Sequence, residues 1–591
     1  MTDQRCLGMI TGLTILAFCA WPAPAAEDTL SSSDVLMRAL VDELTRALKL
    51  RMEDLEQPYF IQYGVDDSIS YDLSARYGAI TSSQRERSRR FYSRVRVGAY
   101  ELDNTNFAGE QGLFAFFGGG AGGGGQATLP LDDDYRAIRQ AIWKATDDDY
   151  KEAVETLTKK RAYLKDKTIE DRPNDFTKAE PVEKLEPGAV LRFDKAQWEE
   201  NLRRISAQFK AQHQVQDSNA RLLVGAGNEY VVNSEGTRVR IGETGVLLLI
   251  TAEVQAEDGM RIAGSRSYAG ETVDELPPLD KILADMDMLV KELTAAMQAP
   301  IIERYTGPVL FDGLSAAQMF RVMLADGVVG KVEPVGTQRR SFEGAENLEK
   351  KLGQRILPKS FQVYDDPTAK RSNDTPLLGH YRYDHEGVPA RRVDLVVDGV
   401  LKDMCLSRVP TRKLSGSNGH ARRAPNASEP QAAVGCLFVK DDNGLSDRDL
   451  KAALIQAAKE EGLEYAVRIA SVKSTALGAS RSEMFSFFMR LQQGRGGGIG
   501  DPVVAYKVYV SDGHEEPFRG CEFGQAEVAA LKKITGAGDA PAVYNYVAFG
   551  MGGATPPSTI VAPSVLFSEL ELSKIEQEHD KLPILKAPLA R

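Results

Sequence analysis

Histidine and cysteine are the residues that could hold a metal ion or act as nucleophiles in this chain, and both are scarce. The sequence contains six histidines, at positions His213, His380, His385, His420, His514 and His579. A catalytic zinc ion needs three protein ligands and an open position for water. His385 and His514 are each followed by a glutamate, but the chain contains no His-x-x-x-His. The spacing of the histidines therefore predicts no standard zinc motif.

The sequence also lacks a clear pattern for a serine or cysteine nucleophile or for a catalytic pair of carboxylates. Ser417 lies in Gly-Ser-Asn-Gly, one residue short of the Gly-x-Ser-x-Gly turn that presents a serine nucleophile. Cys405 and Cys436 lie in apolar, strand-like surroundings, which predicts small buried side chains and not nucleophiles. The paired carboxylates Asp365 and Asp366 are interpreted as a solvated turn.

One stretch, Gly307–Gly330, has the pattern of an element that could position a site. It predicts a short buried strand at Val309–Phe311, a turn, and an amphipathic helix with Ser315 as N-cap that ends near Gly327. The spacing of Met319, Phe320, Met323 and Leu324 predicts that these side chains share the inward face of the helix.

This strand–turn–helix resembles the one that carries the metal site in the TldD/PmbA family, the metallopeptidase-like "modulator of DNA gyrase" proteins. Further segments add to the resemblance in the family's order: Ser407-Arg-Val-Pro410, Ser417-Asn-Gly-His420, Ala537–Tyr544 and Pro563–Phe567. The resemblance implies an N-terminal α+β domain, a β-rich C-terminal domain, a dimer, and peptide cleavage in the members that keep the metal. Within it, Ser417, Asn418, Gly419 and His420 are candidate peptide-binding residues.

The metal ligands of the family are missing from the matching helix. Active members carry His-Glu-x-x-x-His there, and this chain has Arg321 and Val322 at the His-Glu pair and Asp326 at the second histidine. The cysteine that completes the family's metal shell is also absent, because Gly550-Met-Gly-Gly553 has none, and Cys521 is not assigned that role. We therefore expect no metal cofactor, and zinc only if unrecognised ligands exist.

Length and composition set the broad class. The chain has 591 residues, of which 42% are hydrophobic and 27% charged, as in folded globular proteins. The length favours two domains. A formal net charge of −11 argues against a nucleic-acid surface, which usually shows a basic patch.

The N-terminus has the pattern of a signal peptide. Arg5 is followed by an apolar run, Leu7–Trp21, and then by the small-x-small sequence Ala23-Pro24-Ala25. We expect cleavage after residue 25, export to a bacterial periplasm, no lipid on Cys19 and no membrane anchor. Three cysteines then remain, Cys405, Cys436 and Cys521, which allow at most one disulfide.

The fold class predicted is α+β. We expect an N-terminal α+β domain at 26–300, interrupted by an insertion at about 110–187, and a β-rich C-terminal domain at 301–591 with a curved antiparallel, barrel-like sheet. The insertion begins with the glycine-rich stretch 118–125. It continues as a peripheral helical hairpin of two helices, 133–144 and 147–164, each opened by an aspartate triplet.

Two functions from different classes remain open. The first is a metal-free subunit that binds peptide and pairs with itself or with a TldD-like sister chain. The alternative is an active exported zinc metallopeptidase with non-standard ligands. The missing histidines favour the first.

Overall fold

The structure is a computed structural model of the whole chain. It describes residues 34–52, 54–108, 126–167, 171–337, 347–424, 427, 429–473, 499–524, 528–547, 549–550, 553–554, 556–576, 581–583, 585 and 588. The predicted signal peptide at 1–25 and the glycine-rich stretch 118–125 lie outside these residues. None of the described helices is both long enough and apolar enough to cross a membrane.

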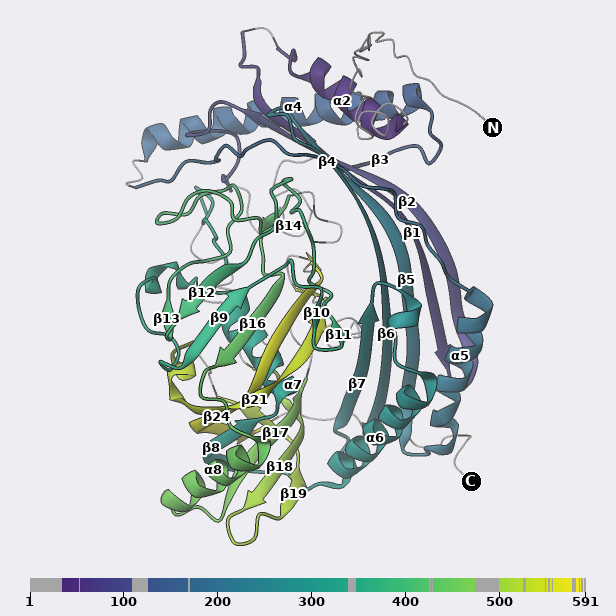
Figure 1. Cartoon of the computed structure of the whole chain (residues 1–591), viewed down its shortest axis with the longest axis vertical. Coiled ribbons are helices and arrows are strands. Elements are labelled where there is room, and N and C mark those ends of the chain that lie inside the picture. Colours follow the sequence, from purple (N-terminus) through teal and green to yellow (C-terminus); the bar gives the residue numbers. More distant parts are fainter. Residues whose placement is uncertain are drawn as a thin grey trace, which may run out of the picture.

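The N-terminal half is built on one long, curved sheet (Figure 1). Its strand order is β3 (Gln126–Thr128), β2 (Ala79–Val97), β1 (Pro58–Arg76), β5 (Val215–Asn233), β6 (Arg238–Gln255) and β4 (Glu183–Leu185), with β7 (Arg261–Gly270) also paired to β6. Neighbouring strands are antiparallel, apart from the parallel pair β4–β6. The helices among the described residues of this half are α2 (Val35–Ala47), α4 (Tyr135–Asp166), α5 (Lys195–Ala207) and α6 (Leu279–Gln298).

Alternation of apolar residues decides which face of this sheet the helices cover. Along β5, Ala220, Leu222 and Val224 are buried while the residues between them are half-buried. These side chains share a core with Leu202 of α5 and Leu289 of α6. Burying one face of a two-sided sheet against amphipathic helices is the basis of an α+β fold. The α+β class is therefore confirmed.

The predicted helical hairpin at 133–164 is wrong, because α4 is one continuous helix of 32 residues. Its N-cap is Asp134, which accepts hydrogen bonds from the main-chain N–H groups of residues 136 and 137. Asp147 and Asp148 do not start a second helix. They pair instead with Lys151 and Lys144, one turn away on the same helix, an arrangement that supports a continuous helix.

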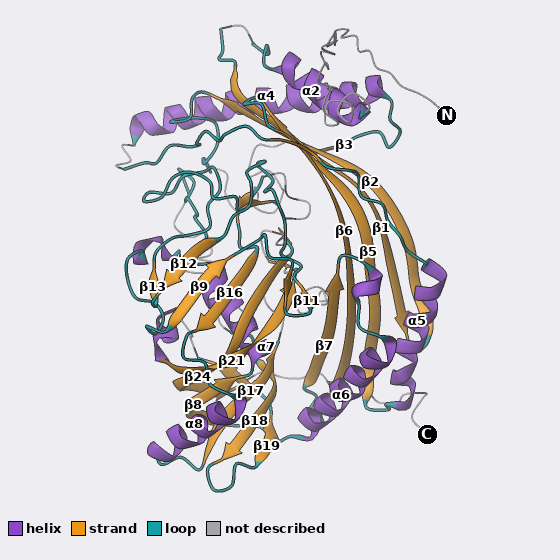
Figure 2. Cartoon of the chain, viewed as in Figure 1, coloured by secondary structure: helices purple, strands orange, loops and turns teal. Residues whose placement is uncertain are grey.

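The expectation that this insertion is peripheral is also wrong. Ile138, Ile142 and Leu157 of α4 are buried in a core that includes Ile61 of β1 and Val95 of β2. Figure 2 shows α4 lying across one end of the long sheet, beside α2. Removing this helix would expose the apolar side chains that it covers, so it belongs to the N-terminal core.

The C-terminal half is built on a second sheet of eleven strands, which the sequence predicted as antiparallel and barrel-like. The order is β13 (Val400–Leu401), β12 (Val393–Val397), β9 (Phe361–Asp365), β16 (Cys436–Asp441), β24 (Ser558–Lys574), β8 (Arg304–Phe311), β17 (Tyr465–Val472), β18 (Pro502–Tyr509) and β19 (Glu515–Phe518). β20 (Cys521–Phe523) and β21 (Ile534–Tyr546) also pair with β24. Two pairs, β16–β24 and β8–β17, are parallel, so the sheet is mixed. Among the described strands the order does not close into a barrel.

Short elements complete the C-terminal half. The helices are α7 (Gly313–Phe320) and α8 (Asp447–Glu460). Three two-stranded ribbons pair β10 (Arg371–Ser372) with β11 (Thr375–Pro376), β14 (Ala421–Arg422) with β15 (Gln431–Ala432), and β22 (Phe549–Gly550) with β23 (Gly553–Ala554). Single turns of 3-10 helix are η1 (Gln208–Ala211), η2 (Val273–Glu275), η4 (Leu348–Lys351) and η5 (Val528–Lys533).

The predicted strand–turn–helix at 307–330 lies at the centre of this half. Phe311 of β8 and Phe320 of α7 are fully buried in its main core. The N-cap position is Asp312, and the predicted cap Ser315 instead donates to the main-chain oxygens of Asp312 and Ile469. The regular helix stops at Phe320 and is followed by a π-helical turn, η3 (Arg321–Ala325), which precedes the predicted end at Gly327. The inward face of the helix was predicted correctly.

Candidate functional site

The three positions assigned from the sequence to the family's metal motif lie just after α7, with Arg321 and Val322 on the π turn η3 and Asp326 directly after it. Arg321 and Val322 are half-buried, and Asp326 is exposed. The Arg321 guanidinium lies 5.0 Å from the centre of the Tyr546 ring, a cation–π distance. Burial raises the pKa of Tyr546 above its ordinary value, Arg321 acts to lower this pKa, and Asp326 acts to raise it. Both charged side chains therefore act on the same phenol.

These residues do not fit a catalytic zinc ion. A guanidinium stays protonated and offers no lone pair to a metal, and a valine offers no donor atom. Asp326 alone would supply one oxygen, where a catalytic zinc site needs three protein ligands. The side chains at these three positions therefore offer a single ligand residue, Asp326, at this surface.

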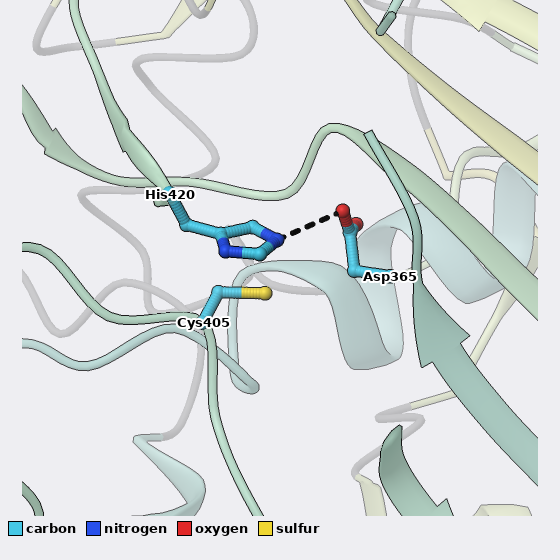
Figure 3. Close-up of side chains that lie close together, drawn as sticks. All are labelled: Asp365, Cys405 and His420. Carbon is cyan, nitrogen blue, oxygen red and sulfur yellow. Dashed lines mark hydrogen bonds and ion pairs between the residues drawn. The ribbon is translucent and has the colours of Figure 1, made fainter. Parts of the chain in front are cut away.

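A second cluster, formed by Asp365, Cys405 and His420, has the donor atoms that α7 lacks (Figure 3). Asp365 is the last residue of β9, Cys405 lies in the loop after β13, and His420 directly precedes β14. One donor atom from each residue lies within 4.8 Å of the donors of the other two. His420 Nε2 is 3.1 Å from Asp365 Oδ1. All three side chains are fully buried.

Main-chain groups fix the Asp365 carboxylate. The N–H of Gly435 donates to both of its oxygens, at 3.1 and 3.0 Å, and the N–H of Cys436 lies 3.3 Å from Oδ1. A buried carboxylate needs such donors because its charge has lost contact with water. The predicted solvated turn at Asp365 is therefore wrong, and this carboxylate joins β9 to the start of β16.

Asn418 fixes the other two members of the cluster. Its side-chain Oδ1 accepts from the N–H of Leu406, and its Nδ2 donates to the carbonyl of Met404, the two residues that flank Cys405. The main-chain oxygen and the Oδ1 of Asn418 lie 3.0 and 2.9 Å from His420 Nδ1. Because both acceptors face Nδ1, this nitrogen carries a proton.

The segment 417–420, predicted to bind peptide, is thus largely committed to these internal contacts. Asn418 and His420 are buried, and their polar atoms bond to the chain itself. Ser417 is half-buried and donates to the Leu406 carbonyl. A peptide-binding role for this segment stays a prediction, and the geometry leaves no accessible polar atom on Asn418 or His420 for it.

The described cysteines are all free thiols and all buried. Burial raises the pKa of the Cys405 thiol well above its ordinary value, and the nearby Asp365 carboxylate acts in the same direction. Cys436 lies in β16, where its thiol contacts a main-chain oxygen, and Cys521 lies in β20 beside β24. The expected burial of Cys405 and Cys436 is confirmed, and Cys405 has His420 and Asp365 beside it.

Buried ion pairs join the N-terminal half to the C-terminal half, and we call this contact the interface. Arg94 of β2 pairs with Glu386 at 3.0 Å, with side-chain exposures of 4% and 1%. Arg423 binds both oxygens of Asp66 of β1, at 3.0 and 2.7 Å. Pairs of this kind are costly to break from one side, because a buried charge is left alone.

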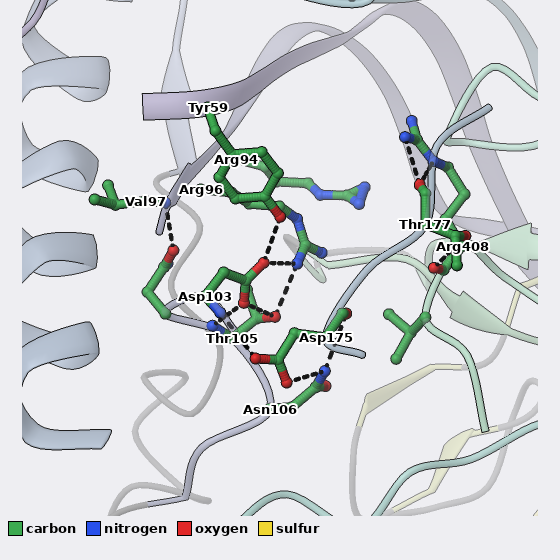
Figure 4. A network of polar contacts seen from close by, with 12 residues as sticks. Tyr59, Arg94, Arg96, Val97, Asp103, Thr105, Asn106, Asp175, Thr177 and Arg408 are labelled. Atoms are coloured by element: carbon green, nitrogen blue, oxygen red, sulfur yellow. Dashed lines mark hydrogen bonds and ion pairs between the residues drawn. The ribbon is translucent and has the colours of Figure 1, made fainter. Parts of the chain in front are cut away.

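Arg408 is the centre of the same interface. Its side chain is fully buried, donates twice to the Thr177 carbonyl, and pairs with Glu235. Figure 4 shows Arg408 and Thr177 beside a second network, in which Asp103 accepts hydrogen bonds from Tyr59 and Arg96. The resemblance at 407–410 therefore marks a structural arginine and not a catalytic one.

His385, one of the two histidines followed by glutamate, also lies at the interface. Its Nδ1 accepts from the main-chain N–H of Arg423, and its Nε2 lies 3.6 Å from Glu229 of β5. Burial and the Arg423 charge lower the pKa of His385 to about 3. Burial and the Asp66 carboxylate raise the pKa of Glu229 to about 8. The imidazole is thus neutral at pH 7 and serves as a hydrogen-bonding group.

An open cavity of about 560 Å³ lies at one side of the interface. It is lined by Asp171, Arg172, Pro173, Asn174 and Thr177 from the N-terminal half and by Pro410, Thr411, Arg412, Lys413 and Ser415 from the C-terminal half. Three of these residues are cationic and one is an acid. Ligand sites often form between domains, and the charge of this lining suits an anionic group.

Asp365 and Cys405 were not identified as functional candidates from the sequence, and Arg412 was not either. Asp365, Cys405 and His420 lie far apart in the chain, and no fixed spacing links them. Their proximity results from the pairing of β9 with β16 and from the Asn418 contacts. A pattern of residue types along the chain carries no signal for such a cluster.

Comparison with known proteins relates part of the C-terminal half to a family. Residues 304–465 match a family described as "PmbA/TldA metallopeptidase C-terminal domain". The chain is 38% identical over 81 residues to a metalloprotease of Archaeoglobus fulgidus, which covers 14% of this chain and 18% of that protein. It is 28% identical over 195 residues to a metalloprotease of Methanothermobacter thermautotrophicus, covering 33% and 39%. The matches thus span less than two thirds of the length of either relative.

The fold is also shared with a solved structure. TldE from Thermococcus kodakarensis superposes with a TM-score of 0.56 over 91% of this chain and 100% of that chain, at 12% sequence identity. An identity this low shows a common fold alone, and it extends the likeness from the matched residues to most of the chain.

Proposed function

The chain belongs to the TldD/PmbA family, and on that premise we propose that it acts as a peptide-binding or partner subunit without a catalytic metal ion. One observation carries the proposal. Where the resemblance would place the family's metal motif, after the end of α7, the chain has Arg321, Val322 and Asp326. This set cannot activate water on zinc, because two of its three members offer no metal ligand.

The cavity at the interface is the place proposed for the peptide. Its cationic lining suits a carboxylate, either the end of a peptide or an acidic side chain. Arg412 is exposed there, so its guanidinium can reach a ligand without breaking a buried contact. Binding without cleavage would let the chain present or retain a peptide for a sister subunit.

The proposed setting is the bacterial periplasm, and the proposed partner is a second copy or a TldD-like sister chain. The apolar run and the Ala23-Pro24-Ala25 sequence support export. N-terminal sequencing of the protein from cells is expected to start near residue 26. A chain that began at Met1, or at an acylated Cys19, would contradict export.

The alternative, an active zinc metallopeptidase with other ligands, has weaker support. Among the described residues, the one group of His, Cys and acid donors close enough to share an ion is Asp365, Cys405 and His420. All three are fully buried, so a peptide carbonyl cannot reach an ion held between them. Catalysis at that cluster would need an opening that the structure does not have.

The test combines hydrolysis with binding. The purified chain, with and without added zinc, is incubated with a library of labelled peptides, and binding is followed by fluorescence anisotropy. We expect hydrolysis at the level of buffer, saturable binding of acidic peptides, and a dimer in light scattering. Arg412→Ala should weaken binding about fivefold to tenfold through the loss of one charge-assisted contact.

Arg304→Ala is the matched control, because this arginine is exposed and lies on β8, outside the cavity lining. It should leave the binding constant unchanged. Peptide cleavage that follows the chain through every purification step and disappears in His420→Ala or Cys521→Ser would move the protein to the active peptidases. Equal loss of binding in both arginine variants would reject the cavity as the binding place.

A further inference from the structure

The Asp365–Cys405–His420 cluster has the chemistry of a metal site that is separate from the motif on α7. Thiolate, imidazole and carboxylate are the three ligand types that zinc accepts in proteins. A thiolate together with an imidazole selects borderline and soft transition metals over Mg²⁺ or Ca²⁺. From this donor set and its burial we propose that Asp365, Cys405 and His420 hold one divalent transition-metal ion of the zinc class as a structural crosslink.

The groups around the cluster are those that orient metal ligands. A ligating histidine normally donates its other ring N–H to an oxygen, which fixes the tautomer. Here Nδ1 of His420 faces two oxygens of Asn418, so Nε2 is the nitrogen directed to the cluster. A ligating carboxylate is likewise held by outer hydrogen bonds, and Gly435 donates to Asp365. Both partners are in place without the ion.

The distances require only small movements. Two ligands bound to a tetrahedral ion at about 2.0–2.1 Å lie about 3.3 Å apart, and His420 Nε2 lies 3.1 Å from Asp365 Oδ1. Figure 3 shows the Cys405 sulfur beside these two side chains, directed toward them. All three donors lie within 4.8 Å of one another. The Cys405 sulfur would have to move closer to the other two donors to reach the roughly 2.3 Å that a zinc–sulfur bond needs.

The charges balance with and without the ion. Without it, one proton lies on Nδ1 of His420, which faces Asn418, and a second lies in the 3.1 Å contact between Nε2 and Asp365 Oδ1, while Cys405 is a free thiol. Binding one M²⁺ displaces this second proton and the thiol proton to solvent. The new set is one thiolate, one carboxylate, one neutral imidazole and the ion, so the buried net charge stays zero. Burying the ion therefore adds no uncompensated charge.

The role that follows is structural. The three ligands come from the end of β9, the loop after β13 and the loop before β14, which an ion would join. Their complete burial excludes a substrate. Three protein ligands leave one tetrahedral position for a water molecule or a carbonyl oxygen. The inference is independent of the proposed function, which concerns α7 and the interface cavity.

Cobalt is the probe for this site, because a bound thiolate gives Co²⁺ an intense charge-transfer absorption in the near ultraviolet. The full chain is expressed in cobalt-supplemented minimal medium, and its metal content is measured after dialysis. We expect one ion per chain together with the thiolate band. Cys405→Ser should remove the band and lower the metal content at least tenfold. Cys436→Ser and Cys521→Ser, which alter the other two buried thiols, should keep both signals.

A measurement on the unaltered chain guards against variants that do not fold. Stripping the ion and adding Zn²⁺ back in weakly buffered solution near pH 7 should release about two protons per ion bound. A fully metallated chain without the thiolate band, a band that persists in Cys405→Ser, or a chain that takes up no ion under any of these conditions would overturn the site. Peptide hydrolysis has no part in these readouts, so the outcome is separate from that of the proposed function.

Discussion

The end of α7 and the Asp365–Cys405–His420 cluster both lie within residues 304–465, the region that matches the family. Each place has a feature that the other lacks. The end of α7, where the resemblance would put a metal motif, is partly accessible but presents Arg321, Val322 and Asp326. The cluster has thiol, imidazole and carboxylate donors but no access. Accessibility and donor chemistry are separate requirements for catalysis, and in the described part of this chain no single place meets both.

The two places also differ in what their side chains contribute to stability. At the cluster, both oxygens of Asp365 and both ring nitrogens of His420 face partners within the fold, so each specifies how loops and strands meet. On α7, Asp326 is exposed and replaceable. Replacing the same type of residue in each of the two places, and comparing the loss of stability, therefore tests this difference directly.

The largest effect is expected at the two aspartates. Asp365→Ala removes the partner of His420 and leaves the N–H groups of Gly435 and Cys436 without an acceptor, so it should lower the free energy of unfolding by about 3–5 kcal/mol. Asp326→Ala should change it by no more than about 0.5 kcal/mol. Denaturant unfolding of both variants measures the difference. Similar values for the two would show that the buried carboxylate is not a structural partner.

A somewhat smaller effect is expected at Asn418. Asn418→Ala leaves the buried Leu406 N–H and the Met404 carbonyl unpaired, at about 1–3 kcal/mol for each group. Ser417→Ala, next in the chain, loses a single 3.3 Å hydrogen bond and should cost about 1 kcal/mol or less. The same unfolding experiment applies. A loss at Ser417 that equals the loss at Asn418 would mean that the loop, and not the amide, fixes the cluster.

The interface gives a case between the two places, since its ionisable groups are buried or half-buried and pair with one another. The pKa of His385 is lowered from 6.5 to about 3, so between these values the unfolded state binds more protons than the folded state. Stability from this group is present above about pH 6.5 and is lost as the pH falls toward 3. The groups that face this histidine are Arg423, Asp66, Arg422 and Glu229.

His385→Gln should therefore flatten the fall in unfolding free energy between pH 6.5 and pH 4. Glu229 acts in the opposite direction: its pKa is raised to about 8, so its contribution falls as the pH rises from 4.5 to 8. His514→Gln, in an exposed turn, is the control and should leave the pH profile unchanged. Thermal unfolding at a series of pH values measures both. If the pH profile of the unfolding free energy were the same in His385→Gln as in the unaltered chain, the lowered pKa of His385 would be contradicted.

The sequence predicted those parts of the fold whose signal is local. The apolar spacing at 307–324 identified β8, α7 and the inward face of the helix, because periodicity reports burial directly. The division of α4 was wrong because aspartates inside a helix can pair with lysines one turn away instead of capping a new helix. The parallel pairs β8–β17 and β16–β24 were missed because strand order depends on crossover connections, which alternation does not encode.

The candidate sites, like the elements of the fold, divide into those that have a local sequence signal and those that have none. The missing ligand motif on α7 is a prediction from the sequence alone, because it needs only a motif and its register. The Asp365–Cys405–His420 cluster could not be predicted in this way, since its members are brought together by strand pairing and by the side chain of Asn418. Arg408 and Arg423 read as parts of polar loops, although both are held in ion pairs at the interface. Whether a charged residue is buried depends on the residue that it pairs with. For both arginines that residue lies far away in the chain, so the local sequence does not indicate the burial.

The smallest effect on stability is expected where the motif is restored. The triple variant R321H/V322E/D326H returns two imidazoles and a glutamate to the end of α7. It loses the contact of Arg321 with the Tyr546 ring, worth about 0.5–1 kcal/mol. Peptide hydrolysis should stay at the level of buffer, because the chain has no cysteine at 544–562 to complete the shell and two imidazoles alone are a weak zinc site. The single variant Arg321→Met gives the cost of the cation–π contact alone and serves as the matched control. Zinc-dependent hydrolysis by the triple variant, absent from Arg321→Met, would show that α7 lacks only its ligands and that the rest of a catalytic centre is intact around it.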